Sequence, residues 1–143
     1  MKNHAIVLSV LALAFLCRVA GQLWVVLASP GFLPPPEAWH SGLLPYPLLL
    51  PLQVAILAFQ LAVSLQLWKG RGPLTHTRPA MGRFIKYFSL VYFLGMGARY
   101  GLTMYAWPEK RWLGDMIPIC FHCVLALYLY VLSRHFRDLP LKS

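Results

Sequence analysis

Four stretches of the chain are long enough and apolar enough to cross a lipid bilayer as helices. They cover about residues 5–28, 48–68, 84–107 and 112–132 of the 143-residue sequence. A helix rises about 1.5 Å per residue, so about 20 apolar residues cross roughly 30 Å of hydrocarbon. The sequence therefore predicts an all-α integral membrane protein, a four-helix bundle that forms a single transmembrane domain over residues 1–143.

The composition leaves no room for a soluble domain of useful size. Hydrophobic residues make up 59% of the chain and charged residues only 12%, whereas soluble domains are nearer half apolar and a quarter charged. The sequence also lacks a P-loop, an H-E-x-x-H motif, a G-x-S-x-G motif and an acidic pair that could hold a catalytic metal. We therefore expect no resident metal or cofactor, and the missing motifs argue against an enzyme without deciding the question.

The first two spans are separated by a proline-rich loop over residues 29–47. This loop carries no Lys or Arg, and its aromatic residues Trp39 and Tyr46 suit the interface between membrane and water. Proline fixes φ and removes a backbone donor, so a stiff loop is expected here. Its prolines are Pro30, Pro34, Pro35, Pro36, Pro45 and Pro47.

The distribution of basic residues predicts the orientation. Nine Lys and Arg residues lie in the N-terminal end, the middle loop with the start of the third span, and the C-terminal tail, whereas the other two loops hold Lys110 and Arg111. Positive charge is retained on the cytoplasmic side of membrane proteins. We therefore expect both termini in the cytoplasm, most simply at a bacterial inner membrane. This rule also accounts for the net charge of +9, so no nucleic-acid partner is expected.

Two arginines, Arg18 and Arg99, lie within predicted spans. A charged residue inside the membrane is costly, by roughly 2.5 kcal/mol or more for an arginine, and is a functional candidate by default. Both helices run from inside to outside. Each arginine then lies roughly 20 Å beyond the cytoplasmic face, in the outer third of the bilayer.

Other polar residues fall at the same depth on the remaining helices. Gln53 and His122 lie roughly 8 to 13 Å below the outer face, since the even-numbered helices run inward. Gln22 is one turn beyond Arg18, and Asp115 shares a helix face with His122. A site that contains two arginines and at most one acidic residue favours an anionic ligand. The predicted ligand-binding residues are Arg18, Gln22, Gln53, Arg99, His122 and Asp115.

The same residues also fit simpler interpretations. Arg18 and Arg99 can extend outward to lipid headgroups, or to Glu37 and Glu109, because both lie within a side chain's reach of the interface. For His122 alone, a hydrogen-bonded structural role is the simpler interpretation.

Small residues and cysteines give weaker signals. Gly97 and Gly101 form a G-x-x-x-G pair, which lets two membrane helices approach closely and suggests a partner subunit. Cys120 and Cys123 form a C-x-x-C pair inside a helix, where that spacing makes ordinary neighbours. We expect these two cysteines and Cys17 to have structural roles.

Three functions follow from these patterns. The first is a membrane protein whose outward-facing cationic pocket binds an anionic ligand or lipid headgroup. The second is an accessory subunit of a larger membrane complex, packed through the glycine pair. The third is a redox protein that holds a quinone or haem near His122.

Overall fold

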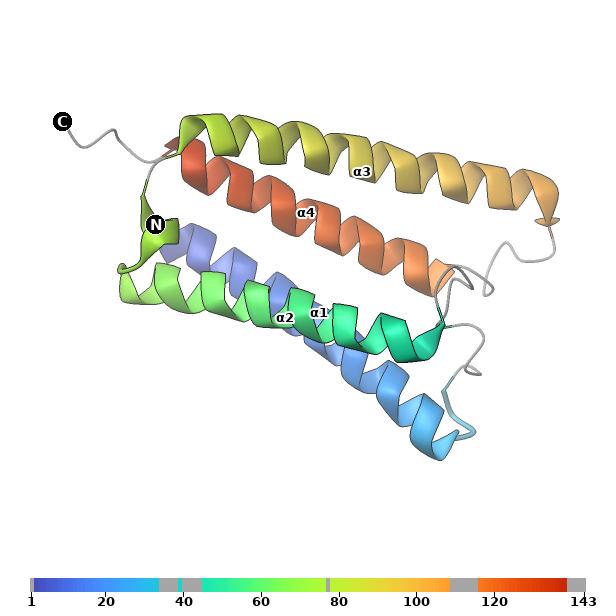
Figure 1. The fold of residues 1–143 in the computed structure, drawn as a ribbon. Helices are drawn as coiled ribbons and strands as arrows, with labels where there is room; N and C mark the ends of the chain where they lie inside the picture. The colour runs from blue at the N-terminus through green and yellow to red at the C-terminus, as the bar shows by residue number, and fades with distance from the viewer. Residues whose placement is uncertain (1, 34–38, 40–44, 77, 109–115, 139–143) are drawn as a thin grey trace.

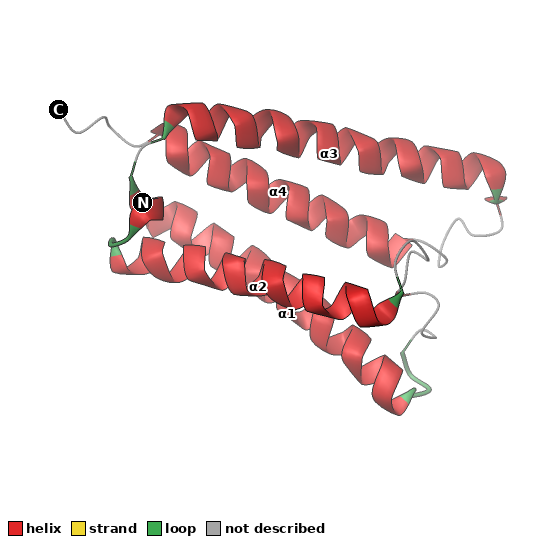
Figure 2. Cartoon of the chain, viewed as in Figure 1, coloured by secondary structure: helices red, strands yellow, loops and turns green. Residues whose placement is uncertain are grey.

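A computed structural model of the chain describes residues 2–33, 39, 45–76, 78–108 and 116–138. Within these residues the fold consists of four long helices and one short 3₁₀ turn, with no strand (Figure 2). The predicted all-α helical bundle is therefore confirmed. The elements are α1 (Lys2–Ala28), α2 (Tyr46–Lys69), η2 (Pro73–Thr75), α3 (Pro79–Ala106) and α4 (Met116–Asp138).

Three of the four helices are long and apolar enough to cross a membrane: α1, α2 and the part of α4 over Ile117–Arg137. α3 is long enough, with 28 residues, but Arg99 and its several tyrosines and glycines make it less apolar. It packs along α4 and runs beside it (Figure 1). We therefore expect α3 to cross together with α4, on grounds of packing and not of apolar character.

The helices are arranged so that α4 lies between α1 and α3. α1 packs against both α2 and α4, whereas α3 makes its main contacts with α4 (Figure 1). Helices that pack together run in opposite directions, and the start of α1 lies at the same end of the bundle as the end of α4. α3 is thus the outermost helix and is attached along one side.

The core lies near the end of the bundle that carries the N-terminus. It draws on α1, α2 and α4, and among α3 residues only Ile85 packs against it, partly buried. Its members are Ala5, Leu8, Ala12, Val63, Leu67, Tyr128, Leu132 and Phe136. Because Phe136 and its neighbours Ser133 and His135 are fully buried, α4 continues past the predicted end at residue 132 as far as Asp138.

α3 comes close to the backbone of α4 at Gly82. A Cβ at Gly82 would lie 3.0 Å from the backbone oxygen of Ser133 and 2.8 Å from Cγ of Arg137. Beside it, the backbone N–H of Arg78 donates to the carbonyl of Phe136 at 3.4 Å. By contrast, a Cβ at Gly97 or at Gly101 would meet nothing within 4 Å. The predicted G-x-x-x-G pair therefore plays no part in packing among the described residues.

We expect fusions to show that both ends of the chain lie on the cytoplasmic side. A reporter that is active only outside the cytoplasm should be active when fused at residue 40 and silent when fused after Ser143. The reasons are the charge asymmetry of the loops and the shared end of the bundle at which α1 begins and α4 ends. A cytoplasmic signal at residue 40, or an external one after Ser143, would overturn this topology.

Candidate functional site

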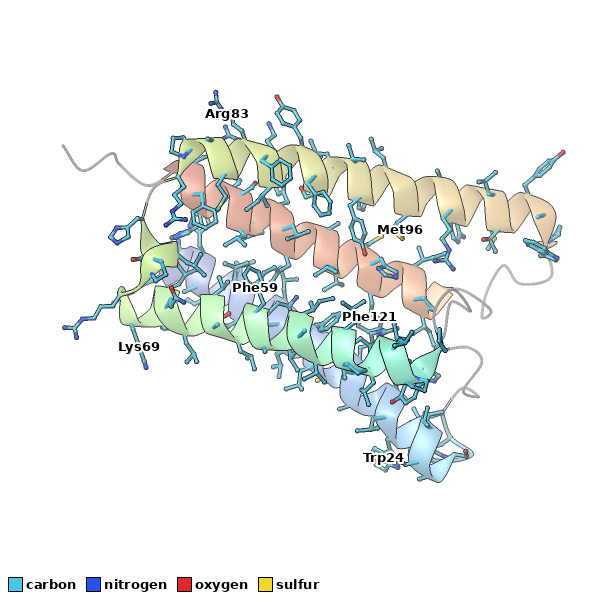
Figure 3. All side chains as sticks on the ribbon, viewed as in Figure 1. Trp24, Phe59, Lys69, Arg83, Met96 and Phe121 are labelled. Carbon is cyan, nitrogen blue, oxygen red and sulfur yellow. The ribbon has the colours of Figure 1, made fainter. Side chains whose placement is uncertain are left out.

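Arg18 of α1 is buried in the protein, with 7% of its surface exposed. Its Nη2 donates to the backbone carbonyl of Trp39 at 3.3 Å, and its guanidinium carbon lies 5.5 Å from the centre of the Phe121 ring of α4. Figure 3 shows Phe121 between α4 and the pair of α1 and α2. Arg18 thus points inward, which excludes for this residue the interpretation that it extends to headgroups.

The loop residue Trp39 reaches this position because α1 has a glycine there. The Trp39 ring packs on Gly21, where an added Cβ would lie 3.1 Å from a ring carbon. Gly21 is three residues after Arg18, so the two share a face of α1. The sequence patterns did not predict this contact. The signals for it are a glycine one turn from Arg18 and an aromatic residue in the following loop.

The two glutamines of the predicted site form a buried pair across α1 and α2. Nε2 of Gln53 donates to Oε1 of Gln22 at 3.1 Å, and the side chains are 4% and 0% exposed. The other amide atoms, Nε2 of Gln22 and Oε1 of Gln53, have no hydrogen-bond partner among the described residues, and neither has Nε of Arg18. Unpaired polar atoms are costly when they are buried away from water. The polar layer formed by Arg18, Gln22 and Gln53 can therefore accept and donate further hydrogen bonds.

His122 of α4 faces α3 and pairs with a residue that sequence reasoning overlooked. The hydroxyl of Tyr92 and Nδ1 of His122 are hydrogen-bonded, and their rings meet edge to face at 5.8 Å. Tyr92 lies seven residues before Arg99 on α3, which puts both on one helix face. That spacing is the sequence signal for Tyr92, although a tyrosine in a membrane helix is not by itself a sign of a polar site.

Arg99 is half-buried and completes the polar layer from α3. It makes no hydrogen bond or ion pair with any residue that the structure describes. Its charge and that of Arg18 both lie within electrostatic range of the His122 ring. Met96, one turn before Arg99, points toward α4 in Figure 3. His122 therefore lies within the electrostatic range of one arginine from α1 and of another from α3.

The remaining predicted site residue, Asp115, lies outside the described residues, as do Glu37 and Glu109. The one acidic residue within the described ranges is Asp138, at the opposite end of α4. In the described part of the chain, therefore, no carboxylate lies beside Arg18, Arg99 or His122. The layer is cationic, with hydrogen-bond donors and acceptors around it.

The other side chains that could bind a metal or react lie outside the polar layer or form no cluster. The described residues include no group of three or more His, Cys, Asp or Glu side chains that could hold a metal ion. Cys17, Cys120 and Cys123 are free thiols. His4 and His135 meet at the other end of the bundle, with ring centres 5.8 Å apart, so His4 does not approach His122.

Comparison with protein-family models, curated proteins and solved structures found no match to this chain. A functional proposal must therefore rest on the residues of the chain itself.

Proposed function

We propose that this protein binds the anionic headgroup of a membrane lipid within the outer half of the bundle, at Arg99 and His122. One observation supports this most: two arginines, one buried and one half-buried, lie within electrostatic range of His122, and no carboxylate lies beside them among the described residues. A charge removed from water is costly unless it is paired. A bound phosphate or carboxylate would provide the missing partner.

The two arginines have different roles in this proposal. Arg99 is half-buried and without partners in the described structure, so its guanidinium can offer two parallel N–H groups to a phosphate. Arg18 is held by the Trp39 carbonyl and the Phe121 ring and contributes mainly its positive charge. Tyr92 and His122 supply a hydroxyl and a ring nitrogen that can exchange their mutual hydrogen bond for one to the ligand.

The position of the site favours a lipid over a soluble anion. Arg99 belongs to α3, the outermost helix, which makes its main contacts with α4 alone. A ligand can therefore approach sideways from the bilayer in its outer third. The upper acyl chains of an outer-leaflet lipid lie at this depth, and a long arginine side chain can extend outward to the lipid's headgroup. Arginine is also the side chain best suited to planar, two-pronged recognition of phosphate.

An accessory subunit is the second candidate function, and one observation favours it. The helix face that carries Gly97 and Gly101 has open space beside it, and small residues are the usual contact point between membrane helices. A larger mass than that of the monomer in mild detergent would support this function.

The lipid proposal predicts that Arg99 controls selectivity for anionic lipids. Native mass spectrometry of the purified protein with phosphatidylglycerol or phosphatidylcholine of equal chains should show a preference for phosphatidylglycerol. Arg99→Leu should reduce phosphatidylglycerol binding about tenfold or more, because charge-assisted hydrogen bonds contribute about 1.5–3 kcal/mol. Arg99→Lys should retain part of the binding, since it keeps the charge without the planar fork.

The matched control is Arg83→Leu. Arg83 lies on the same helix but points away from α4 (Figure 3), so its loss should leave the preference unchanged. Arg99→Leu should still fold, because it removes a poorly paired charge from the membrane. Equal phosphatidylglycerol binding by the wild-type protein and Arg99→Leu would rule out the proposal. A visible absorption band in the purified protein would instead favour a haem-binding function near His122.

A further inference from the structure

A groove of about 400 Å³ runs between α3 and α4. Leu90 and Phe93 line it from α3, and Val124, Leu127 and Tyr130 are among the residues that line it from α4. Its volume falls in the range of small-molecule sites, about 300–1,000 Å³. Apart from Ser89, Cys123 and Tyr130, its walls are hydrocarbon or aromatic, so a polar molecule would find few hydrogen-bond partners in it.

One end of this groove adjoins the polar layer. Cys123, which lines the groove, directly follows His122, and Phe93 directly follows Tyr92. Because Tyr92 and His122 are hydrogen-bonded to each other, they mark that end of the groove across both helices. The groove therefore ends beside the site at which the proposed headgroup binds, and Arg99 lies farther out along α3.

The direction of the groove matches that of an outer-leaflet lipid. From Cys123 to Tyr130, α4 advances roughly 10 Å away from the polar layer, at about 1.5 Å per residue. In the predicted orientation this is the direction from the outer half of the membrane toward its centre. A lipid with its headgroup beside Arg99 would extend its chains the same way.

Hydrophobicity alone does not place a chain in this groove, because the surrounding lipid tails are equally apolar. A chain tethered to a bound headgroup is different, since its first carbons are already held at the mouth of the groove. Its contacts with the walls then add van der Waals attraction without the cost of a separate association.

We infer that the groove holds a hydrocarbon chain of the same lipid whose acidic headgroup is bound at Arg99 and His122. The ligand is then an amphiphile with an anionic head and at least one long alkyl chain, entering sideways between α3 and α4. This inference rests on the function proposed above, because the head fixes where the chain begins.

The test uses phosphatidylglycerol that carries a photoreactive diazirine in one acyl chain, incorporated with the full-length protein into phosphatidylcholine vesicles. After illumination, mass spectrometry of peptides should place the label mainly on residues 89–93 and 123–130. Leu127→Trp should lower this labelling several-fold, because Leu127 lines the groove and is 49% exposed, so a larger side chain fills the groove without entering the core.

Leu61→Trp is the matched control, since Leu61 on α2 is 45% exposed and does not line this groove. It should leave the labelling unchanged. Label spread evenly over all four helices, or unaffected by Leu127→Trp, overturns the groove inference. If Arg99→Leu still abolishes phosphatidylglycerol selectivity in that case, the proposed headgroup site stands. Equal groove labelling by a phosphatidylcholine probe, unchanged in Arg99→Leu, overturns both.

Discussion

Replacing Gly82 with valine is expected to destabilise the protein by about 1–3 kcal/mol, the usual effect of overpacking a tight contact. A Cβ at this position would lie 3.0 Å from the Ser133 oxygen and 3.2 Å from Cβ of Phe136. The Ser133 oxygen belongs to the backbone of α4, so it cannot move aside as a flexible side chain would. α3 must therefore shift away from α4. Thermal unfolding in mild detergent measures the effect.

The same substitution at Gly97 is the control. A side chain there would meet open space, and valine is the better helix former of the two by a few tenths of a kcal/mol. Gly97→Val should thus be neutral or slightly stabilising for the monomer. If both variants unfold at the wild-type temperature, Gly82 is not the contact that holds α3. If Gly97→Val is the more harmful, the exposed glycine face is packed against another chain.

Gly82 also has a functional consequence. It brings α3 to α4 near one end of the bundle, and the Tyr92–His122 hydrogen bond links the same two helices farther along. We expect Gly82→Val to weaken phosphatidylglycerol selectivity together with stability, because Arg99 depends on the position of α3.

Truncating Tyr128 to alanine is expected to cost about 3 kcal/mol, the lower end of the range for removing a buried aromatic side chain. The lower end applies because transfer from water contributes little between helices in a membrane. Tyr128 is 1% exposed and belongs to the core that joins α1, α2 and α4. Its loss would leave a void beside a second groove, between α2 and α4, which Tyr128 lines together with Phe59 and Leu129.

A milder substitution separates packing from hydrogen bonding. The Tyr128 hydroxyl donates to the backbone carbonyl of Gln60 at 3.2 Å, so Tyr128→Phe should cost about 1 kcal/mol. Tyr105 is 90% exposed, and Tyr105→Ala should change the unfolding free energy by less than about 0.5 kcal/mol. Equal losses for Tyr128→Ala and Tyr105→Ala would show that the core does not depend on Tyr128.

The polar layer illustrates which parts of a site can be predicted. Depth along a helix follows from counting residues, and in the structure Gln22 and Gln53 are hydrogen-bonded, whereas Arg18 and Arg99 lie within electrostatic range of His122. The partners of these groups were not predictable in the same way. The Trp39 carbonyl and the Phe121 ring hold Arg18, and both depend on how a loop and a neighbouring helix are placed.

Four long helices can be predicted from the amino-acid sequence alone, as can the ends of α1 and α2 to within a few residues. The long apolar runs and the proline-rich loop over residues 29–47 determine local backbone structure, so their effect can be predicted without knowledge of the tertiary fold. The extension of α4 to Asp138 escaped this reasoning, because it depends on the burial of His135 and Phe136 against other elements.

Which face of each helix meets its neighbour follows from the three-dimensional packing and not from the sequence pattern. In a soluble helix, polar residues mark the outward face. A helix in lipid is apolar on both its packed and its lipid-exposed sides, so the pattern of apolar residues does not define its rotation. This is why Gly82, and not the pair of Gly97 and Gly101, proved to be the close contact, and why Tyr92 appeared as the partner of His122 only in three dimensions.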